Sequence, residues 1–221
     1  MADGINTVIF DMDGVIFDSE ILVLSSWKEV AGRHGIQDVE KVCHECLGTN
    51  SAVSKQIFLR YYGQDFPYDE YKAEMAEVFF AHASDGKLAK KQGVEELLKY
   101  LKDKGFKVGI ASSTREKIVR RQISEGGLLE YFDQIVGGDM VKHSKPEPDI
   151  FLEACGRLES KPENCYVIED SYNGIRAAHA AGMHPIMVPD LMEPTEEMKS
   201  LAEQILGSLC AVQEFLQESV R

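Results

Sequence analysis

The sequence predicts an α/β fold in which a parallel sheet carries helices on both faces and a helical segment interrupts the sheet after its first strand. Short apolar runs rich in β-branched residues alternate with amphipathic helical patterns, which is typical of parallel sheets. This alternation stops between roughly residues 18 and 90, where helical patterns occur without a convincing strand. We therefore expect one sheet, formed by chain segments on both sides of a helical insertion.

Five apolar runs are predicted as buried strands, and helical patterns connect them. The runs are residues 7–10, 107–111, 134–136, 165–168 and 185–188. The helical patterns near the sheet are residues 94–101, 118–123, 150–158 and 172–181. In the first of these, Val94, Leu97, Leu98 and Leu101 follow the i, i+3, i+4, i+7 spacing of an amphipathic helix. The predicted domains are a core of residues 1–17 and 91–221 and a helical domain of residues 18–90.

The charge of the chain limits its partners. The 221 residues carry a formal net charge of −13, which argues against a non-specific nucleic-acid partner because phosphate-backbone binding needs clustered cations. It also argues against an anionic membrane surface. A small anionic substrate remains compatible, since a bound metal and a few local cations can reverse the field in one pocket.

The sequence has no apolar run of 18 residues and no N-terminal segment with signal-peptide features. We therefore expect a cytoplasmic protein without a membrane span, and we expect a monomer. The chain has five scattered cysteines, which do not suggest a disulfide framework. Cys43 and Cys46 have C-x-x-C spacing, but a closed zinc site would need a second ligand pair. We favour two ordinary thiols on a helix over a metal or redox site.

Two carboxylates follow the first predicted strand. Asp11 and Asp13 stand at i and i+2, and Gly14 permits the chain to curl there. Phosphoryl transfer would use such a pair, because one carboxylate can attack phosphorus while the other donates a proton to the leaving oxygen. The alternative is a polar turn that caps a helix.

Polar residues also follow the next strands. Ser112 and Ser113 end the second strand and suit phosphate oxygens, although they could simply cap the following helix. Lys145 lies in a segment that two prolines make rigid, where a lysine can neutralise phosphate, although an exposed loop lysine is the ordinary alternative. Glu169 and Asp170 end another strand and offer the hard oxygen ligands that magnesium prefers, although Asp170 or Ser171 could instead cap the following helix. Since ligands of parallel sheets bind at the carboxyl ends of strands, these residues together indicate one phosphate and metal site.

The motifs in this order resemble those of the haloacid dehalogenase-like (HAD) hydrolase superfamily. They are Asp11-x-Asp13-Gly14, Ser112-Ser113, Lys145-Pro146 and Glu169-Asp170-Ser171. Within the superfamily, the chain is similar over essentially its whole length to the β-phosphoglucomutase and sugar-phosphate phosphatase branch. The resemblance implies a Rossmann-like parallel sheet core with an inserted α-helical cap domain.

The resemblance also implies catalytic and metal-binding roles. Asp11 would be the nucleophile and a Mg²⁺ ligand. Asp13 would be the general acid and base, and its backbone carbonyl would bind the metal. Asp170 would bind Mg²⁺, with Glu169 bound directly or through water. Dehalogenases generally lack the second aspartate, so Asp13 favours a phosphatase.

Further roles concern the substrate. Ser112, the Ser113 amide and Lys145 would bind the transferring phosphate. Glu20 and Gly48 would face the substrate from the hinge and the cap. Glu20 could instead be an exposed residue at a helix start.

We therefore predict a magnesium-dependent phosphatase that acts on a small phosphorylated metabolite, such as a sugar phosphate, through an aspartyl-phosphate. A phosphomutase is the main alternative, and a non-catalytic binding module is a weaker one. A phosphonatase would need a cap lysine such as Lys28, which has no other support. Val23, Leu47 and Ser51 stand where we align a histidine, a lysine and an arginine of β-phosphoglucomutases, which favours hydrolysis unless Lys55 or Arg60 compensates.

Overall fold

The computed structural model of the chain describes residues 4–47, 49, 51–83 and 88–219. Its centre is a six-stranded sheet with the order β3-β2-β1-β4-β5-β6, in which every neighbouring pair of strands is parallel. The strands are β1 (Thr7–Phe10), β2 (Lys107–Ser112), β3 (Gln134–Gly137), β4 (Cys165–Glu169), β5 (His184–Met187) and β6 (Gln204–Ile205). The predicted parallel α/β sheet is confirmed.

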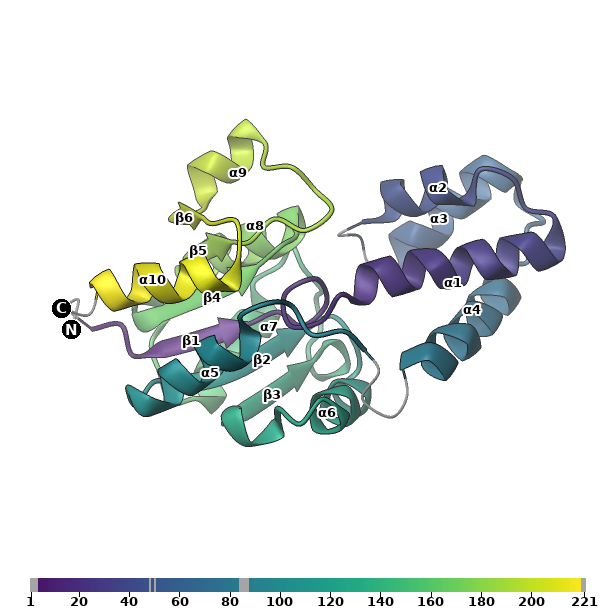
Figure 1. Ribbon diagram of the computed structural model, residues 1–221. Coiled ribbons are helices and arrows are strands. Elements are labelled where there is room, and N and C mark those ends of the chain that lie inside the picture. Colours follow the sequence, from purple (N-terminus) through teal and green to yellow (C-terminus); the bar gives the residue numbers. More distant parts are fainter. Residues whose placement is uncertain (1–3, 48, 50, 84–87, 220–221) are drawn as a thin grey trace.

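Helices cover both faces of this sheet (Figure 1). The longer ones are α5 (Val94–Asp103), α6 (Glu116–Glu125), α7 (Asp149–Arg157), α8 (Tyr172–Ala180) and α10 (Leu209–Ser219). Shorter ones are α9 (Glu196–Leu201), η1 (Leu129–Tyr131), η2 (Gly138–Met140) and η3 (Pro162–Asn164). Side chains of a strand alternate between faces, so Val8 and Phe10 pack in one core cluster with residues of α5, α6 and α10. Ile9 packs in another with residues of α7 and α8.

The amphipathic pattern of α5 has its predicted effect. Leu97, Leu98 and Leu101 are fully buried, and Val94 is nearly so. Gly105 then adopts the left-handed conformation (φ 76°), two residues after the helix ends. The helix thus packs its apolar stripe against the sheet and turns the chain into β2.

Four helices lie apart from the sheet and pack against one another (Figure 1). They are α1 (Ser19–His34), α2 (Val39–Cys46), α3 (Ser51–Tyr62) and α4 (Tyr68–Ala83), which together we call the helical region. Aromatic rings form part of its core, with centroids of Trp27 and Phe58 4.6 Å apart and those of Phe58 and Tyr68 5.1 Å apart. The separation into domains at residues 17/18 and 90/91 remains a prediction.

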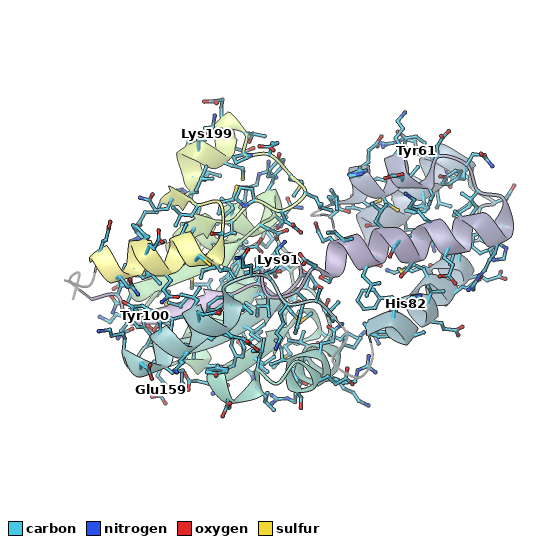
Figure 2. All side chains as sticks on the ribbon, viewed as in Figure 1. Tyr61, His82, Lys91, Tyr100, Glu159 and Lys199 are labelled. Atoms are coloured by element: carbon cyan, nitrogen blue, oxygen red, sulfur yellow. The ribbon has the colours of Figure 1, made fainter. Side chains whose placement is uncertain are left out.

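The chain passes between the sheet and the helical region at two neighbouring segments. The Asp18 amide donates to the Ala89 carbonyl, and the Lys91 amide donates to the Ile16 carbonyl, both over 2.9 Å. We call residues 16–18 and 89–91 the paired connection. Figure 2 shows Lys91 at this junction. These two backbone hydrogen bonds therefore hold the entry and exit of the helical region side by side.

The two cysteines of the C-x-x-C pattern lie in and against the core of the helical region. Burial raises the pKa of Cys43 to about 12 and that of Cys46 to about 11. The thiols therefore stay protonated near neutral pH, which disfavours redox chemistry at this pair. Lys28, the lysine that a phosphonatase would need, pairs with Glu40 over 3.0 Å. Among the described residues, no helix is long and apolar enough to cross a membrane.

Candidate functional site

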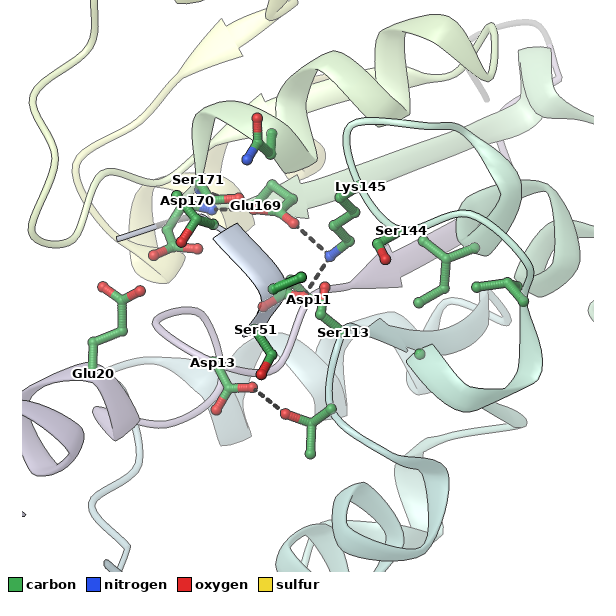
Figure 3. A pocket seen from close by; sticks show the side chains of 17 residues that line it. Asp11, Asp13, Glu20, Ser51, Ser113, Ser144, Lys145, Glu169, Asp170 and Ser171 are labelled. Carbon is green, nitrogen blue, oxygen red and sulfur yellow. Dashed lines mark hydrogen bonds and ion pairs between the residues drawn. The ribbon is translucent and has the colours of Figure 1, made fainter. Parts of the chain in front are cut away.

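A pocket of about 540 Å³ lies at the carboxyl ends of the strands, between the sheet and the helical region. Most of the predicted site residues line it (Figure 3), namely Asp11, Asp13, Glu20, Ser113, Lys145, Glu169 and Asp170. Ser112 is fully buried and is not among the lining residues. Gly48 lies outside the described residues. The fold thus brings together groups that are far apart in the sequence.

A buried lysine joins two of the strand ends. Lys145 Nζ donates to Asp11 Oδ1 over 2.6 Å, to Glu169 Oε1 over 2.7 Å and to the Ala111 carbonyl over 3.1 Å. Burial opposes its charge, but the carboxylates of Asp11 and Glu169 raise the pKa of Lys145 above its ordinary value. The ammonium therefore stays charged and holds the two carboxylates in fixed positions.

Asp11 lies directly beyond β1, where its amide donates to the Ile168 carbonyl of β4 over 2.9 Å. Its side chain is buried, and burial raises the pKa of Asp11 to about 8, although Lys145 acts in the opposite direction. Glu169 and Asp13 add repulsion that raises it further. Burial is thus the main cause of the raised pKa, and the Lys145 ammonium offsets it only in part.

Three hydroxyl groups surround the side chain of Asp13. Ser19 Oγ donates to Oδ1 over 2.6 Å, and Thr114 Oγ1 donates to Oδ2 over 3.1 Å. Ser112 Oγ lies 3.5 Å from the same Oδ2 and also accepts from the Thr114 amide over 3.1 Å. The Ser112 hydroxyl thus contacts Asp13 and the turn after β2, whereas Ser113 reaches the pocket.

Glu169 uses both of its carboxylate oxygens inside the protein. Oε1 accepts from Lys145, while Oε2 accepts from the Asp170 amide over 3.0 Å and from the Ser171 amide and hydroxyl, each over 2.9 Å. The first turn of α8 lies so close to this carboxylate that a Cβ on Gly174 would stand 1.8 Å from Oε1. Glycine at this position therefore lets Glu169 keep its contacts.

Asp170 points from the end of β4 toward the loop after β1. Gly14 has φ +79°, and a Cβ there would lie 2.2 Å from Asp170 Oδ2, so the loop needs glycine both for its conformation and for this close approach. Burial and the neighbouring acids, Glu169 above all, raise the pKa of Asp170 well above its ordinary value. A cation here would offset that unfavourable charge.

One group of carboxylates among the described residues has metal-ligand spacing, and it differs from the predicted set of Asp11, Asp13, Glu169 and Asp170. Ligand oxygens of Glu20, Asp170 and Asp190 all lie within 4.8 Å of one another. The set is made of the hard oxygen donors that Mg²⁺ prefers. The residues present therefore fit a divalent cation, with Asp170 common to both sets.

Glu20 comes from the first turn of α1 and extends toward the side of the pocket that holds Asp170 (Figure 3). Burial, followed by repulsion from Asp190, raises the pKa of Glu20 to about 7. Asp190 is absent from the set of residues that the sequence predicts. It follows β5 by three residues, so the strand-end rule that identifies the other site residues could have found it as well.

Besides Glu20, the helical region contributes Thr49, Ser51 and Ala52 to the pocket wall. Lys55 and Arg60 are the two cations that could compensate for the lysine and arginine of β-phosphoglucomutases. Both lie in exposed ion pairs, Lys55 with Asp69 and Arg60 with Glu45. A further cation, Lys72 of α4, donates a hydrogen bond to the Ser51 hydroxyl. The described wall on this side therefore presents hydroxyl groups and one carboxyl group but no cation, and Lys72 contacts the wall residue Ser51.

Comparison with known proteins gives relatives along most of the chain. The phosphorylated carbohydrates phosphatase of Thermotoga maritima is 33% identical over 179 residues, which cover 81% of this chain and 82% of that protein. The beta-phosphoglucomutase of Bacillus subtilis is 33% identical over 191 residues, 82% of each chain. The bifunctional riboflavin kinase/FMN phosphatase of Arabidopsis thaliana is 32% identical over 203 residues, 91% of this chain. The chain spans about half of that longer relative (53%).

Solved structures agree with the sequence relatives. The crystal structure of CbbY from Rhodobacter sphaeroides in complex with phosphate has a TM-score of 0.78 and 29% identity, covering 94% of this chain and 96% of that one. The family model described as haloacid dehalogenase-like hydrolase matches residues 8–188. The chain therefore belongs to the haloacid dehalogenase-like hydrolases, the superfamily that its strand-end motifs indicated.

Proposed function

We propose that this protein is a magnesium-dependent phosphatase that acts on a small phosphorylated metabolite, with sugar phosphates as the substrate class, through an aspartyl-phosphate intermediate. The observation that carries the proposal is the buried Lys145, which binds both Asp11 and Glu169 at a pocket that Asp13 also lines. This arrangement supplies a nucleophile, a cation for the phosphate and a second carboxyl group for proton transfer.

In the first step, we assign Asp11 Oδ2 as the attacking oxygen, because Oδ1 accepts the bond from Lys145. The bond from Asp11 to phosphorus forms as the bond to the ester oxygen breaks, and Asp13 gives its proton to that leaving oxygen. In the second step, Asp13 takes a proton from water, which attacks phosphorus and releases Asp11 and inorganic phosphate. Lys145 and Ser113 would bind the phosphate oxygens.

The hydrogen bonds at Asp13 support its assigned role. Ser19 and Thr114 donate to different oxygens of its carboxylate and so fix the direction of the group. Glu169 is better suited to hold Lys145 than to bind a metal directly, since both of its oxygens already accept hydrogen bonds. We therefore assign the direct ligand role to Asp170.

Asp11, the Asp13 carbonyl and Asp170 would hold Mg²⁺, which offsets the repulsion between phosphate and carboxylates. The substrate class rests on the pocket and on relatives such as the Thermotoga maritima carbohydrate phosphatase. A volume of about 540 Å³ is enough for a sugar phosphate. The non-catalytic alternative is disfavoured because Asp11, Lys145 and Asp170 meet in one pocket.

The phosphomutase alternative has a relative in the Bacillus subtilis enzyme. A mutase must bind a second phosphate, which requires cations on the wall that the helical region provides. The described residues of that wall are Glu20, Thr49, Ser51 and Ala52, and Lys55 and Arg60 are engaged with acids elsewhere. We therefore favour hydrolysis.

The test is release of inorganic phosphate from a panel of phosphate esters, with Mg²⁺ and with excess chelator. We expect turnover only with the metal, and recovery when Mg²⁺ is added back. Asp11→Asn should lose at least about 10³-fold in kcat while its circular dichroism and melting temperature stay those of a folded protein. Asp103→Asn, an exposed substitution of the same kind, is the control.

Activity in chelator, or equal activity of Asp11→Asn and the control, would contradict the mechanism. The same panel includes β-glucose 1-phosphate with a catalytic amount of the bisphosphate. Conversion to glucose 6-phosphate that outpaces phosphate release from every tested ester would make the protein a mutase.

A further inference from the structure

Three carboxylates from separate parts of the chain converge at one side of the pocket. Glu20 lies in the first turn of α1, Asp170 at the end of β4 and Asp190 in the segment after β5. Their ligand oxygens lie within 4.8 Å of one another. Three like charges at this spacing repel strongly in a partly dehydrated site, so the arrangement needs a positive partner.

Two oxygens of this cluster lack a donor. Asp190 Oδ2 and Glu20 Oε2 are buried, and neither has a hydrogen-bond partner among the described residues. The Asp190 side chain is only 9% exposed. A buried carboxylate oxygen without a donor is costly, and a cation is a ligand that would satisfy both oxygens at once.

The nearest lysine does not balance the cluster. Lys91 pairs with the other oxygen of Asp190, Oδ1, over 2.6 Å and also with Asp18 over 2.8 Å. Its single charge is therefore divided between two carboxylates, and it leaves Asp190 Oδ2 without a partner among the described residues. Among the described residues, neither Glu20 nor Asp170 forms an ion pair with Lys91.

We propose that Glu20 and Asp190 bind, together with Asp170, the divalent cation of this site. The proposal rests on the proposed function for the identity of the cation, Mg²⁺, and adds two residues to the predicted ligand set. It also gives the cation a second effect. Because Glu20 belongs to α1 and the other two carboxylates follow strands, the bound cation holds the start of the helical region against the sheet.

The experiment measures metal binding without substrate. Mg²⁺ binding is followed by titration calorimetry and Mn²⁺ binding by electron paramagnetic resonance, for the wild-type protein, Asp190→Asn and Glu20→Gln. Glu193→Gln, which removes a carboxylate three residues from Asp190 and outside the cluster, is the control. We expect about tenfold or greater weakening for each of the two cluster variants, a smaller Mg²⁺-induced rise in melting temperature, and no change for the control.

Lys91→Met separates ligand binding from a structural role. If Asp190 acted only by fixing Lys91, this variant would weaken Mg²⁺ binding as Asp190→Asn does. Our proposal expects equal or tighter binding, because Asp190 loses its competing partner. Wild-type affinity in both Asp190→Asn and Glu20→Gln, or weakening by Lys91→Met to the level of Asp190→Asn, would overturn it.

Failure of this inference can be told from failure of the proposed function. If the wild-type protein hydrolyses esters with Mg²⁺ while both cluster variants bind the metal normally, the function stands and the inference is wrong. If the cluster variants lose metal binding but no ester is hydrolysed, the inference stands and the function is wrong.

Discussion

The ionic contacts of the sheet and of the helical region differ in their burial. At the strand ends, the side chains of Lys145, Asp11 and Glu169 are 6%, 9% and 1% exposed. In the helical region, Arg60 and Glu45 form a pair with exposures of 66% and 38%. Buried charges depend on one another for solvation, whereas exposed ones are solvated by water. The buried ion pairs at the strand ends therefore depend on one another more strongly than the exposed pair of the helical region does.

Removal of the buried lysine should have the largest effect. Lys145→Met leaves Asp11 and Glu169 without their shared partner, so we expect about 3–5 kcal/mol loss of unfolding free energy in the metal-free protein and no measurable turnover. Lys28→Met breaks the exposed pair with Glu40 and should cost at most about 1 kcal/mol. Denaturant unfolding of both variants measures the difference. Equal losses would remove the contrast between the regions.

The glycine beside Glu169 gives the next largest effect. In Gly174→Ala the new Cβ would lie 1.8 Å from Glu169 Oε1, so the carboxylate or α8 must move. We expect a loss of about 1–3 kcal/mol in stability together with a fall in kcat. Gly156→Ala is the matched control, because a Cβ on this glycine of α7 would meet no heavy atom within 4 Å, and we expect it to be neutral or to stabilise by up to about 1 kcal/mol. A Gly174→Ala protein as active as this control would show that the position of Glu169 is unimportant.

The smallest effect concerns the helical region. Lys72 donates to Ser51, a residue of the pocket wall, and burial lowers the pKa of Lys72. Lys72→Ala should raise KM about three- to tenfold for esters with a polar or anionic distal group, with kcat nearly unchanged. Lys41→Ala is the control, since Lys41 lies over the Tyr61 ring instead. A fall in kcat at constant KM would contradict this prediction, because it would mean that Lys72 acts in the chemical step and not in substrate binding.

Most of the sheet could be predicted because its strands are short, buried and apolar. The predicted strand at residues 107–111 is β2, Lys107–Ser112, and the predicted strand at 165–168 is β4, Cys165–Glu169. The two-residue strand β6 (Gln204–Ile205) was not predicted, because so short a strand has no periodicity of its own and forms only by pairing with β5. The helices α9 and α10 near the C-terminal end were not predicted either.

The candidate site was predictable where residues follow strand ends. Asp11, Lys145 and Glu169 meet because parallel strands point their carboxyl ends to one edge of the sheet. The inward turn of Ser112 could not be predicted, since it depends on bonds to Asp13 and to the Thr114 amide. The wall residues from the helical region depend on how helices pack in three dimensions, which no local pattern records.

The paired connection determines how the helical region is attached to the sheet. Entry and exit of the helical region are neighbours, joined by the backbone bonds from Asp18 to Ala89 and from Lys91 to Ile16. These bonds use main-chain atoms, and the side chains of Asp18 and Lys91 add an ion pair over 2.8 Å. Because entry and exit lie side by side, β1 and β2 pair as direct neighbours on either side of the helical region. A replacement for the helical region would therefore need two ends that lie as close together as these.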